Sequence, residues 1–209
     1  MRTILLFLLL LCFPERLFSE EYIPHAKLSF RAVSELRNFS GVVIDSPEDV
    51  VTVLTCWHGT MGFQNAKTIT VQLFQPAVDN TQLSAILQLK VIKSSPDKDI
   101  LLLSGPNTLK LKIKKLKIAT DQLLPNIETK SYGYAESVKL IENDSRVLDY
   151  DSTSVGGSPI LYVNALAISG MSGGGLVHNN LLYGIQSVGD NNKVGYCPAD
   201  QILIFLKDE

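Results

Sequence analysis

Three features of the sequence predict an all-β fold: short runs of β-branched and aliphatic residues, turn residues between those runs, and almost no helical periodicity. The expected strands cover residues 42–44, 50–54, 68–74, 83–92 and 100–103. Turn residues separate them at 46–47, 75–76, 95–96 and 105–106. Strands this short and this closely spaced indicate a β-barrel or a β-sandwich.

Only residues 199–206 have the pattern of a helix. The apolar residues on its one face are Ile202, Leu203, Phe205 and Leu206. We therefore expect a short helix to dock the C-terminal segment on the rest of the protein.

Residues 110–117, KLKIKKLK, form the densest run of charge in the chain. A phosphate- or membrane-binding patch is one interpretation of this run. Because its lysines alternate with Leu111 and Ile113, we favour a strand with one solvated face or a protected sheet edge. The boundary between two halves of the chain, residues 20–118 and 119–209, is placed just after it.

The composition is typical of a folded globular protein, since 45% of the 209 residues are hydrophobic and 19% are charged. That length allows one ordinary domain or two small fused ones. The formal net charge of -2 offers no overall attraction to nucleic acid or to anionic membranes. We therefore expect no nucleic-acid partner, and partners must be recognised at a specific site.

The N-terminal residues have the pattern of a secretory signal peptide. Arg2 is followed by an apolar run at 4–13 and then by polar residues that lead to the small residue Ser19. Ten apolar residues are too few to span a bilayer, which takes about 20. We expect residues 1–19 to be removed, leaving a soluble secreted or periplasmic protein without stable membrane insertion; a lipid anchor on Cys12 is the less favoured alternative.

Two cysteines, Cys56 and Cys197, remain after residue 19. They could pair in an oxidising compartment or stay as buried free thiols, and the sequence leaves both possibilities open. In either case the hydrophobic core must supply most of the stability.

A histidine, an aspartate and a serine occur in three short segments, in that order. His58 lies in TCWHGT, Asp99 in PDKDILLL and Ser172 in ISGMSGGGLV. A serine hydroxyl is an effective nucleophile only when a base removes its proton, and a carboxylate orients that base. Glycines beside Ser172 allow the N–H groups of Gly170 and Ser172 to point into one volume, where an oxyanion would form. The three segments indicate acyl-transfer chemistry.

Each of these residues also has a structural interpretation when it is taken alone. The glycine cluster is compatible with a simple turn, and a histidine after a strand is often structural. The segment also matches G-x-S-x-G of the α/β-hydrolases, in which the histidine follows the serine at a distance. Here the only histidine after Ser172 is His178, six residues later, so that class is excluded. His25 and His178 are interpreted as structural.

The three segments resemble motifs of the chymotrypsin-like (trypsin-like) serine proteases, which have the forms T-A-A-H, D-I-A-L-L and G-D-S-G-G-P. Bacterial members related to the HtrA/DegP proteases and the glutamyl endopeptidases are more similar still. Further similar segments are found at residues 40–44, 67–71, 132–134 and 195–196. The resemblance extends over residues 40–206. It leaves no residues for a PDZ domain after the protease region.

The resemblance implies two packed six-stranded antiparallel β-barrels with a short C-terminal helix. Residues 20–118 would form the first barrel with His58 and Asp99, and residues 119–209 would form the second with Ser172. It further implies a secreted serine endopeptidase with His58 as general base, Asp99 as its orienting carboxylate and Ser172 as the nucleophile. Gly170 and Ser172 would supply the oxyanion hole, with no metal or cofactor.

The resemblance also implies how a substrate would bind. An extended protein or peptide segment would pair with the backbone of Ser187 and Gly189. Leu166 corresponds to the floor of the family's primary side-chain pocket. Other residues of that pocket and its mouth would be Ala167, Ser169, Val188, Gly189 and Gly195. Because this set carries no charge, we expect preference for small or medium apolar side chains.

Two departures from the family pattern concern neighbours of the candidate catalytic residues. Met171 stands where digestive relatives have an aspartate, so activation through a salt bridge to a new N-terminus is not expected. Cys56 and Trp57 replace the usual small pair before the histidine. The alternative to an enzyme is a protease-like binding or interaction protein that keeps the fold but lacks turnover.

Overall fold

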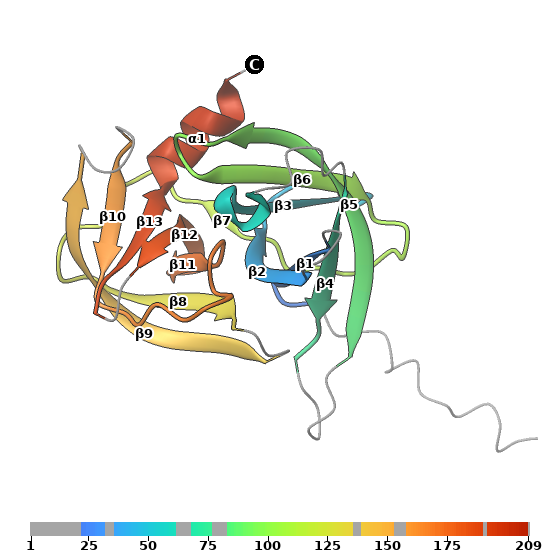
Figure 1. Cartoon of the computed structure of the whole chain (residues 1–209), viewed down its shortest axis with the longest axis horizontal. Helices are drawn as coiled ribbons and strands as arrows, with labels where there is room; N and C mark the ends of the chain where they lie inside the picture. The colour runs from blue at the N-terminus through green and yellow to red at the C-terminus, as the bar shows by residue number, and fades with distance from the viewer. Residues whose placement is uncertain are drawn as a thin grey trace, which may run out of the picture.

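The computed structural model describes residues 22–31, 36–61, 68–76, 83–135, 139–152, 158–189 and 192–208. The expected signal peptide lies outside these residues. The described chain forms two β-barrels side by side, with the helix α1 (Ala199–Lys207) lying across the top of their junction (Figure 1). The predicted all-β class with a short C-terminal helix is confirmed.

The first barrel is a closed antiparallel sheet with the strand order β1-β2-β3-β6-β5-β4. Its strands are β1 (His25–Arg31), β2 (Leu36–Val43), β3 (Val50–Cys56), β4 (Thr68–Phe74), β5 (Ser84–Ser95) and β6 (Ile100–Pro106). The five strands expected from the sequence are all present, and β1 adds a sixth. On β5, Ala85, Leu87 and Leu89 are buried and the residues between them face solvent. This two-residue alternation places one face of the sheet around a core.

The second barrel has the strand order β8-β9-β10-β13-β12-β11 and is closed by pairing between β11 and β12. Its strands are β8 (Glu128–Tyr134), β9 (Leu140–Asp151), β10 (Ile160–Val163), β11 (Gly175–His178), β12 (Leu181–Gly189) and β13 (Val194–Pro198). A short additional strand, β7 (Lys117–Ile118), runs parallel to β12. The expected pair of six-stranded antiparallel barrels is confirmed.

Apolar side chains from both barrels and from α1 form a shared core at the junction. Its buried members are Val42, Ile44, Leu54, Ile100, Leu116, Leu182, Ile185, Cys197, Ile202 and Phe205. The predicted apolar face of the helix supplies Ile202 and Phe205 to this core. The ammonium group of Lys93 on β5 lies 5.1 Å from the centre of the Phe205 ring, which also ties α1 to the first barrel.

The lysine-rich run at 110–117 does not form the strand that we expected. Only isolated bridges occur there, from Ile113 to Tyr22 and from Leu116 to Ile44, before the two residues of β7. Ile113 and Leu116 are buried while Lys112 and Lys114 face solvent. The expected solvated face is present, but the segment crosses between the two barrels and finds no continuous strand to pair with.

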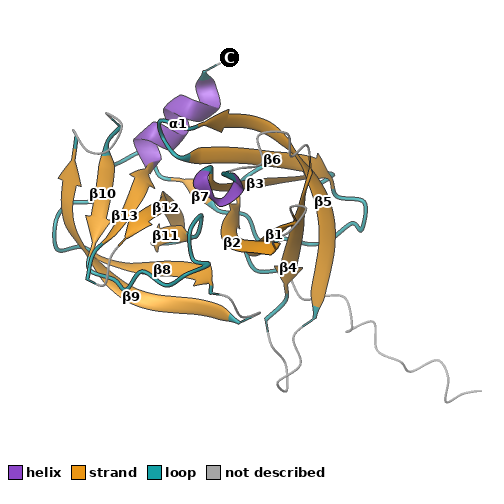
Figure 2. Ribbon diagram, viewed as in Figure 1, coloured by secondary structure: helices purple, strands orange, loops and turns teal. Residues whose placement is uncertain are grey.

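A short 3-10 helix, η2 (His58–Thr60), follows β3 and lies between the two barrels, below α1 in Figure 2. Within the described ranges, no helix combines the length and the apolar character needed to cross a bilayer. The junction at η2 is where the candidate site lies.

Candidate active site

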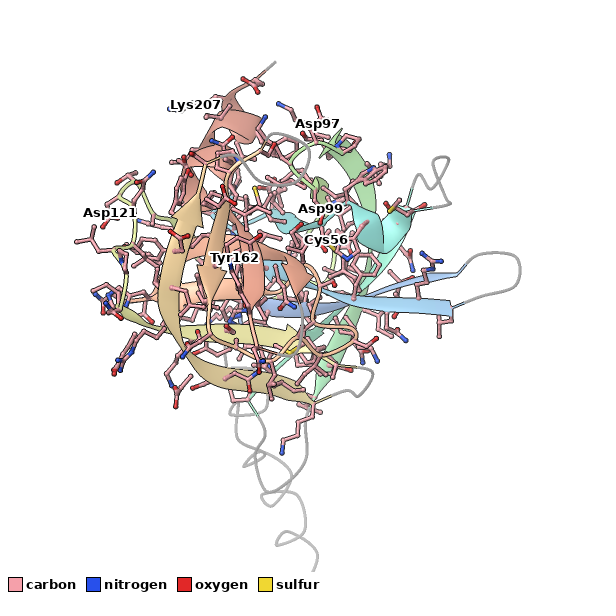
Figure 3. All side chains as sticks on the ribbon, turned by 60° about the vertical axis from the view of Figure 1, so that its left-hand side comes forward. Cys56, Asp97, Asp99, Asp121, Tyr162 and Lys207 are labelled. Carbon is pink, nitrogen blue, oxygen red and sulfur yellow. The ribbon has the colours of Figure 1, made fainter. Side chains whose placement is uncertain are left out.

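His58 and Asp99 become neighbours because their strands pair. His58 is the second residue after the end of β3, and Asp99 directly precedes β6. The two strands are antiparallel, with Cys56 opposite Ile100, so the turns that carry both residues meet at one edge of the barrel. Figure 3 shows Asp99 and Cys56 near the junction of the barrels and Asp97 further out.

The Asp99 carboxylate binds His58 through both oxygens. The backbone N–H of His58 donates to Oδ1 and the ring Nδ1 donates to Oδ2, each at 2.7 Å. An ionised carboxylate can only accept, so Nδ1 carries the ring proton. In the neutral imidazole, Nε2 is then left as the acceptor. The side chains of His58 and Asp99 are 34% and 17% exposed, so the pair is only partly desolvated.

Asp99 has an uncommon backbone conformation, with φ of 53°. This left-handed region costs a residue other than glycine about 1–2 kcal/mol. The Asp99 carbonyl accepts from the N–H of Trp57 at 3.2 Å, and the Asp99 N–H donates to the carbonyl of Pro96 at 3.1 Å. These bonds hold the conformation that aims the carboxylate at His58.

Ser187 is a third partner of this pair and comes from the second barrel. Its hydroxyl donates to Oδ2 of Asp99 at 2.6 Å. Along β12, Gln186 pairs with Tyr196 and Val188 with Gly195, so Ser187 is the extra residue of a bulge. A bulge redirects a side chain, and here the hydroxyl is directed at Asp99. From the sequence we expected only a backbone role for Ser187, because a register shift leaves no signal in the sequence of a single strand.

The His58 imidazole favours its protonated form more than an ordinary histidine does. The hydrogen bond to Asp99 is the main cause that raises the pKa of His58 above the usual 6.5, and burial opposes it. The Asp99 carboxylate therefore stabilises the imidazolium that forms when His58 accepts a proton.

Ser172 lies in a tight turn just before β11. Glycines with positive φ flank it, Gly170 at 90° and Gly173 at 83°. The Ser172 carbonyl accepts from the N–H of Ser40 on β2 at 2.8 Å. A Cβ at position 173 would lie 2.2 Å from the carbonyl oxygen of Ser40, so only glycine allows this close approach. The turn is therefore packed directly against the first barrel.

The N–H groups on this turn divide into two sets. Those of Met171, Gly173 and Gly174 donate to backbone carbonyls at 2.8–3.1 Å. Those of Gly170 and Ser172 have no acceptor among the described residues. They are the groups that the sequence assigned to an oxyanion hole, and both remain available to a ligand.

One cavity contains candidate catalytic groups from both barrels. Its volume is about 590 Å³, and His58, Gly170 and Ser172 line it. The remaining lining residues are Leu36, Arg37, Asn38, Phe39, Gly59 and Ser169. His58 and the Ser172 turn thus border the same volume, although they are 114 residues apart in the chain.

The residues expected to form a primary side-chain pocket do not line one cavity. Leu166 is 60% exposed and lines a different, polar surface hollow that includes Asn164. Ser169 lines the cavity of Ser172, whereas Ser187 and Val188 line another cavity beside Asp99.

Side chains occupy the space between the other residues that were expected to form the primary side-chain pocket. A Cβ at Gly189 would lie 2.6 Å from the Cβ of Ala167, so these residues pack together. A Cβ at Gly195 would lie 2.8 Å from the methyl groups of both Val188 and Ile160.

Two buried hydroxyl residues support the Ser172 turn from the first barrel, and neither was expected from the sequence. Ser40 donates to the carbonyl of Gly170 at 2.8 Å and accepts from the N–H of Tyr134 at 2.7 Å. Thr55 in turn donates to the carbonyl of Ser40 at 2.6 Å. Nothing in the local sequence distinguishes them from other strand residues, since their partners lie on other strands.

The two other described histidines, His25 and His178, make structural contacts. His25 is buried, stacks on Tyr132 with ring centres 4.3 Å apart, and has its pKa lowered to about 3 by burial. His178 donates from Nδ1 to the carbonyl of Glu128 at 2.8 Å. Both contacts agree with the structural interpretation. Cys56 and Cys197 are buried free thiols rather than a disulfide.

Solved structures with the same fold include bacterial serine proteases. The Rv3671c protease of M. tuberculosis in its active form is 18% identical, with a TM-score of 0.66, and the match covers 88% of this chain and 79% of that one. The MamO protease domain of Magnetospirillum magneticum is 20% identical, with a TM-score of 0.67 and coverage of 88% and 96%. The serine endoprotease of Yersinia pestis is 17% identical, with a TM-score of 0.67 and coverage of 88% and 61%.

Neither a protein-family model nor a curated protein sequence matches this chain. The structural likeness, at identities of 17–20%, shows that the chain has the two-barrel fold of chymotrypsin-like serine proteases. The fold expected from the sequence resemblance is thereby confirmed.

Proposed function

We propose that this protein is a serine endopeptidase that cleaves peptide bonds through an acyl-enzyme on Ser172. The observation that carries this proposal is the hydrogen-bonded pair of His58 and Asp99, with His58 lining the same cavity as Ser172. The fold supports it, because solved structures with this fold include serine proteases.

In the proposed reaction, Nε2 of neutral His58 accepts the proton of the Ser172 hydroxyl as Oγ attacks the peptide carbonyl. The imidazolium then donates that proton to the leaving amine, and water cleaves the acyl-enzyme by the same route. Asp99 keeps the ring proton on Nδ1 and stabilises the imidazolium. Asp99 is the third catalytic member, and Ser187 is a positioning residue that acts through it.

The charge that develops on the attacked carbonyl oxygen would be stabilised by the N–H groups of Gly170 and Ser172. Both groups lack a protein acceptor among the described residues, so they are free to bind it. A pre-oriented donor of this kind contributes about 3–4 kcal/mol to lowering the barrier.

The end of β12 offers an edge for an extended substrate. Val188 and Gly189 pair with β13 on one side, while β11 pairs with β12 only as far as Ile185. An extended peptide can therefore add beside residues 187–189 as a further strand. This supports the proposed backbone contacts at Ser187 and Gly189 and a protein or peptide substrate.

We also propose export of the protein to the cell exterior or the periplasm, with residues 1–19 removed. The charge and apolar pattern of these residues supports this part of the proposal.

A fluorophosphonate probe tests the enzyme proposal directly, because it reacts with an activated serine. We expect stoichiometric labelling of the wild type at Ser172, no labelling of Ser172→Ala, and slow labelling of His58→Ala. Hydrolysis of a mixed peptide library should follow the same order.

An unlabelled wild type that unfolds cooperatively would contradict the enzyme proposal. It would instead favour the binding protein that keeps this fold without turnover. Equal labelling of Ser172→Ala would place the nucleophile elsewhere.

A further inference from the structure

The lysine-rich run at 110–117 has no role in the candidate site. Ile113 belongs to the core of the first barrel, and Leu111 packs against that core. The residues that alternate with them are exposed. These are Lys110, Lys112 and Lys114. The segment therefore has an apolar side on the barrel and a second side that presents three ammonium groups to water.

A turn held by side-chain hydrogen bonds precedes these lysines. The side-chain amide of Asn107 donates to the carbonyl of Leu111 and accepts from its N–H, each at 2.9 Å. Within the turn, Lys110 has φ of 50°, which residues other than glycine seldom adopt. The turn presents Leu109, which is 54% exposed, beside the lysines. We call Leu109, Lys110, Lys112 and Lys114 the lysine face.

Acidic residues lie near the lysine face without pairing with it. None of its three lysines forms an ion pair with another described residue. The turn before β3 contacts Asn107 through backbone carbonyls and carries exposed Asp45, Glu48 and Asp49. Five lysines in the run against these three carboxylates leave this part of the surface positive.

The N-terminal segment joins the fold at the lysine face. The N–H of Tyr22 donates to the carbonyl of Lys112 at 2.7 Å, and the N–H of Lys114 donates to the carbonyl of Tyr22 at 2.8 Å. Residues 14–21 connect Tyr22 to the apolar run at 4–13. A stretch of this length spans at most about 28 Å. Entry of the apolar run into a bilayer therefore brings the lysine face close to the lipid headgroups.

We infer that the lysine face is a docking surface for anionic phospholipid headgroups, which holds the folded protein on the surface of a membrane. The lysines bind the phosphate groups, and Leu109 enters the boundary between headgroups and acyl chains. Binding of this kind is peripheral and needs no membrane-spanning segment. It is independent of the proposed peptidase activity.

Short-range attraction allows a protein with a net charge of -2 to bind an anionic surface. At physiological salt, charges further apart than about 8 Å are largely screened, so carboxylates on distant parts of the protein contribute little. A lysine close to an anionic bilayer strengthens binding by about fivefold. The three lysines should together contribute about 100-fold, and burial of Leu109 about tenfold.

Cosedimentation with lipid vesicles tests this inference. The protein is used without residues 1–19, so that the apolar run cannot account for binding; the described residues form both barrels without them. We expect saturable binding to vesicles made of equal parts of phosphatidylcholine and phosphatidylglycerol. Binding to phosphatidylcholine alone should be at least tenfold weaker, and about 0.5 M salt should abolish binding to the anionic vesicles.

Variants assign the binding to the lysine face. Joint replacement of its three lysines by glutamine should weaken binding to the anionic vesicles by about 100-fold. The matched control removes the same charge from exposed lysines elsewhere and should change binding by less than about fivefold. It combines Lys90→Gln, Lys130→Gln and Lys207→Gln.

Two single substitutions test the apolar contact and the sign of the charge effect. Leu109→Gln should weaken binding by about tenfold, whereas Leu124→Gln, which replaces a 70% exposed leucine outside the lysine face, should retain it. Glu48→Gln should strengthen binding by up to about fivefold, because it removes a negative charge beside the face.

Equal binding to both kinds of vesicle, or equal losses in the two triple variants, would overturn the inference. Binding to a soluble polyanion such as polyphosphate or duplex DNA, without binding to vesicles, would also overturn it. The lysine variants should unfold cooperatively and keep fluorophosphonate labelling at Ser172. Vesicle binding by a protein that the probe does not label would contradict the peptidase proposal and leave the docking surface supported.

Discussion

Asp99 links residues from both barrels through one carboxylate, which accepts from His58 and from Ser187. A partly buried carboxylate must be compensated by hydrogen bonds, and a bond to a charged group is worth about 1.5–3 kcal/mol. The neighbouring Asp97 is exposed. The two aspartates lie on the same turn, so they form a natural pair for comparison.

Asp99→Asn should lower kcat by about 10³- to 10⁴-fold with little change in KM, because the amide no longer enforces the Nδ1–H form of His58. The pKa of His58 should fall toward 6.5, since the carboxylate that raises it is gone. Peptide hydrolysis rates and NMR titration of the imidazole measure the two effects. Asp97→Asn is the control and should retain wild-type kinetics; equal losses in both variants would contradict this role for Asp99.

The pH dependence should have opposite signs for activity and for stability. The hydrogen bond to Asp99, with a further contribution from Cys56, raises the pKa of His58 from 6.5 to about 10. Only neutral His58 accepts a proton, so kcat/KM should rise with pH through a pKa above 6.5. The stabilisation from this shift is fully present below pH 6.5 and is lost as pH rises through the folded-state pKa. Rate profiles and urea unfolding between pH 5 and 10 measure both. A rate profile with its acid limb well below pH 6.5 would contradict this expectation.

At the scale of elements, the Ser172 turn depends on its contact with β2 of the other barrel. Ser40 bonds to the turn through its N–H and its hydroxyl, and Thr55 holds the Ser40 carbonyl. Met171 is buried against Gly133 on β8. The turn is therefore positioned by strand backbones and apolar packing.

Gly173→Ala should distort this turn. The new methyl group would lie 2.2 Å from the Ser40 oxygen and 2.3 Å from Oγ1 of Thr55, at a positive φ that itself costs about 1–2 kcal/mol. We expect loss of fluorophosphonate labelling and a drop in Tm of several degrees. Gly105→Ala, whose methyl would lie 3.0 Å from a flexible Leu89 methyl, should keep labelling. Normal labelling of Gly173→Ala would show that the turn adapts.

At the scale of the whole molecule, the candidate site exists only when the two barrels are held together. His58 and Asp99 belong to the first barrel and Ser172 and Ser187 to the second. The shared core at the junction and α1 determine their relative positions. Because α1 packs into this junction from one end, its packing should affect activity although the helix does not carry the candidate catalytic residues.

Phe205→Ala should destabilise the protein by about 3–5 kcal/mol, the usual cost of removing a buried aromatic ring. It should also lower kcat/KM, because the barrels lose part of their shared core. Ile204→Ala on the same helix removes a 44% exposed side chain and should change stability by less than about 0.5 kcal/mol. Urea unfolding and peptide hydrolysis compare the variants. Equal stability losses would indicate that the junction does not depend on Phe205.

The sequence predicted those parts of the protein that depend on short-range patterns. Short runs of β-branched and aliphatic residues between turn residues predicted the strands of the first barrel, one apolar face predicted α1, and glycines were compatible with the tight turn at Ser172. Chain order excluded a second hydrolase class. The strand predicted for the lysine-rich run was wrong, because the alternation in residues 110–114 is not matched by a partner strand.

Only the tertiary structure decided which residues meet across the junction. The bulge that directs Ser187 at Asp99 and the support of Ser172 by Ser40 both join residues far apart in sequence. Local patterns cannot specify such contacts, because they depend on strand register and on how each barrel closes against the other. The sequence by itself determined the chemical groups and the strands that carry them; barrel packing decided their geometry and the space left for a substrate.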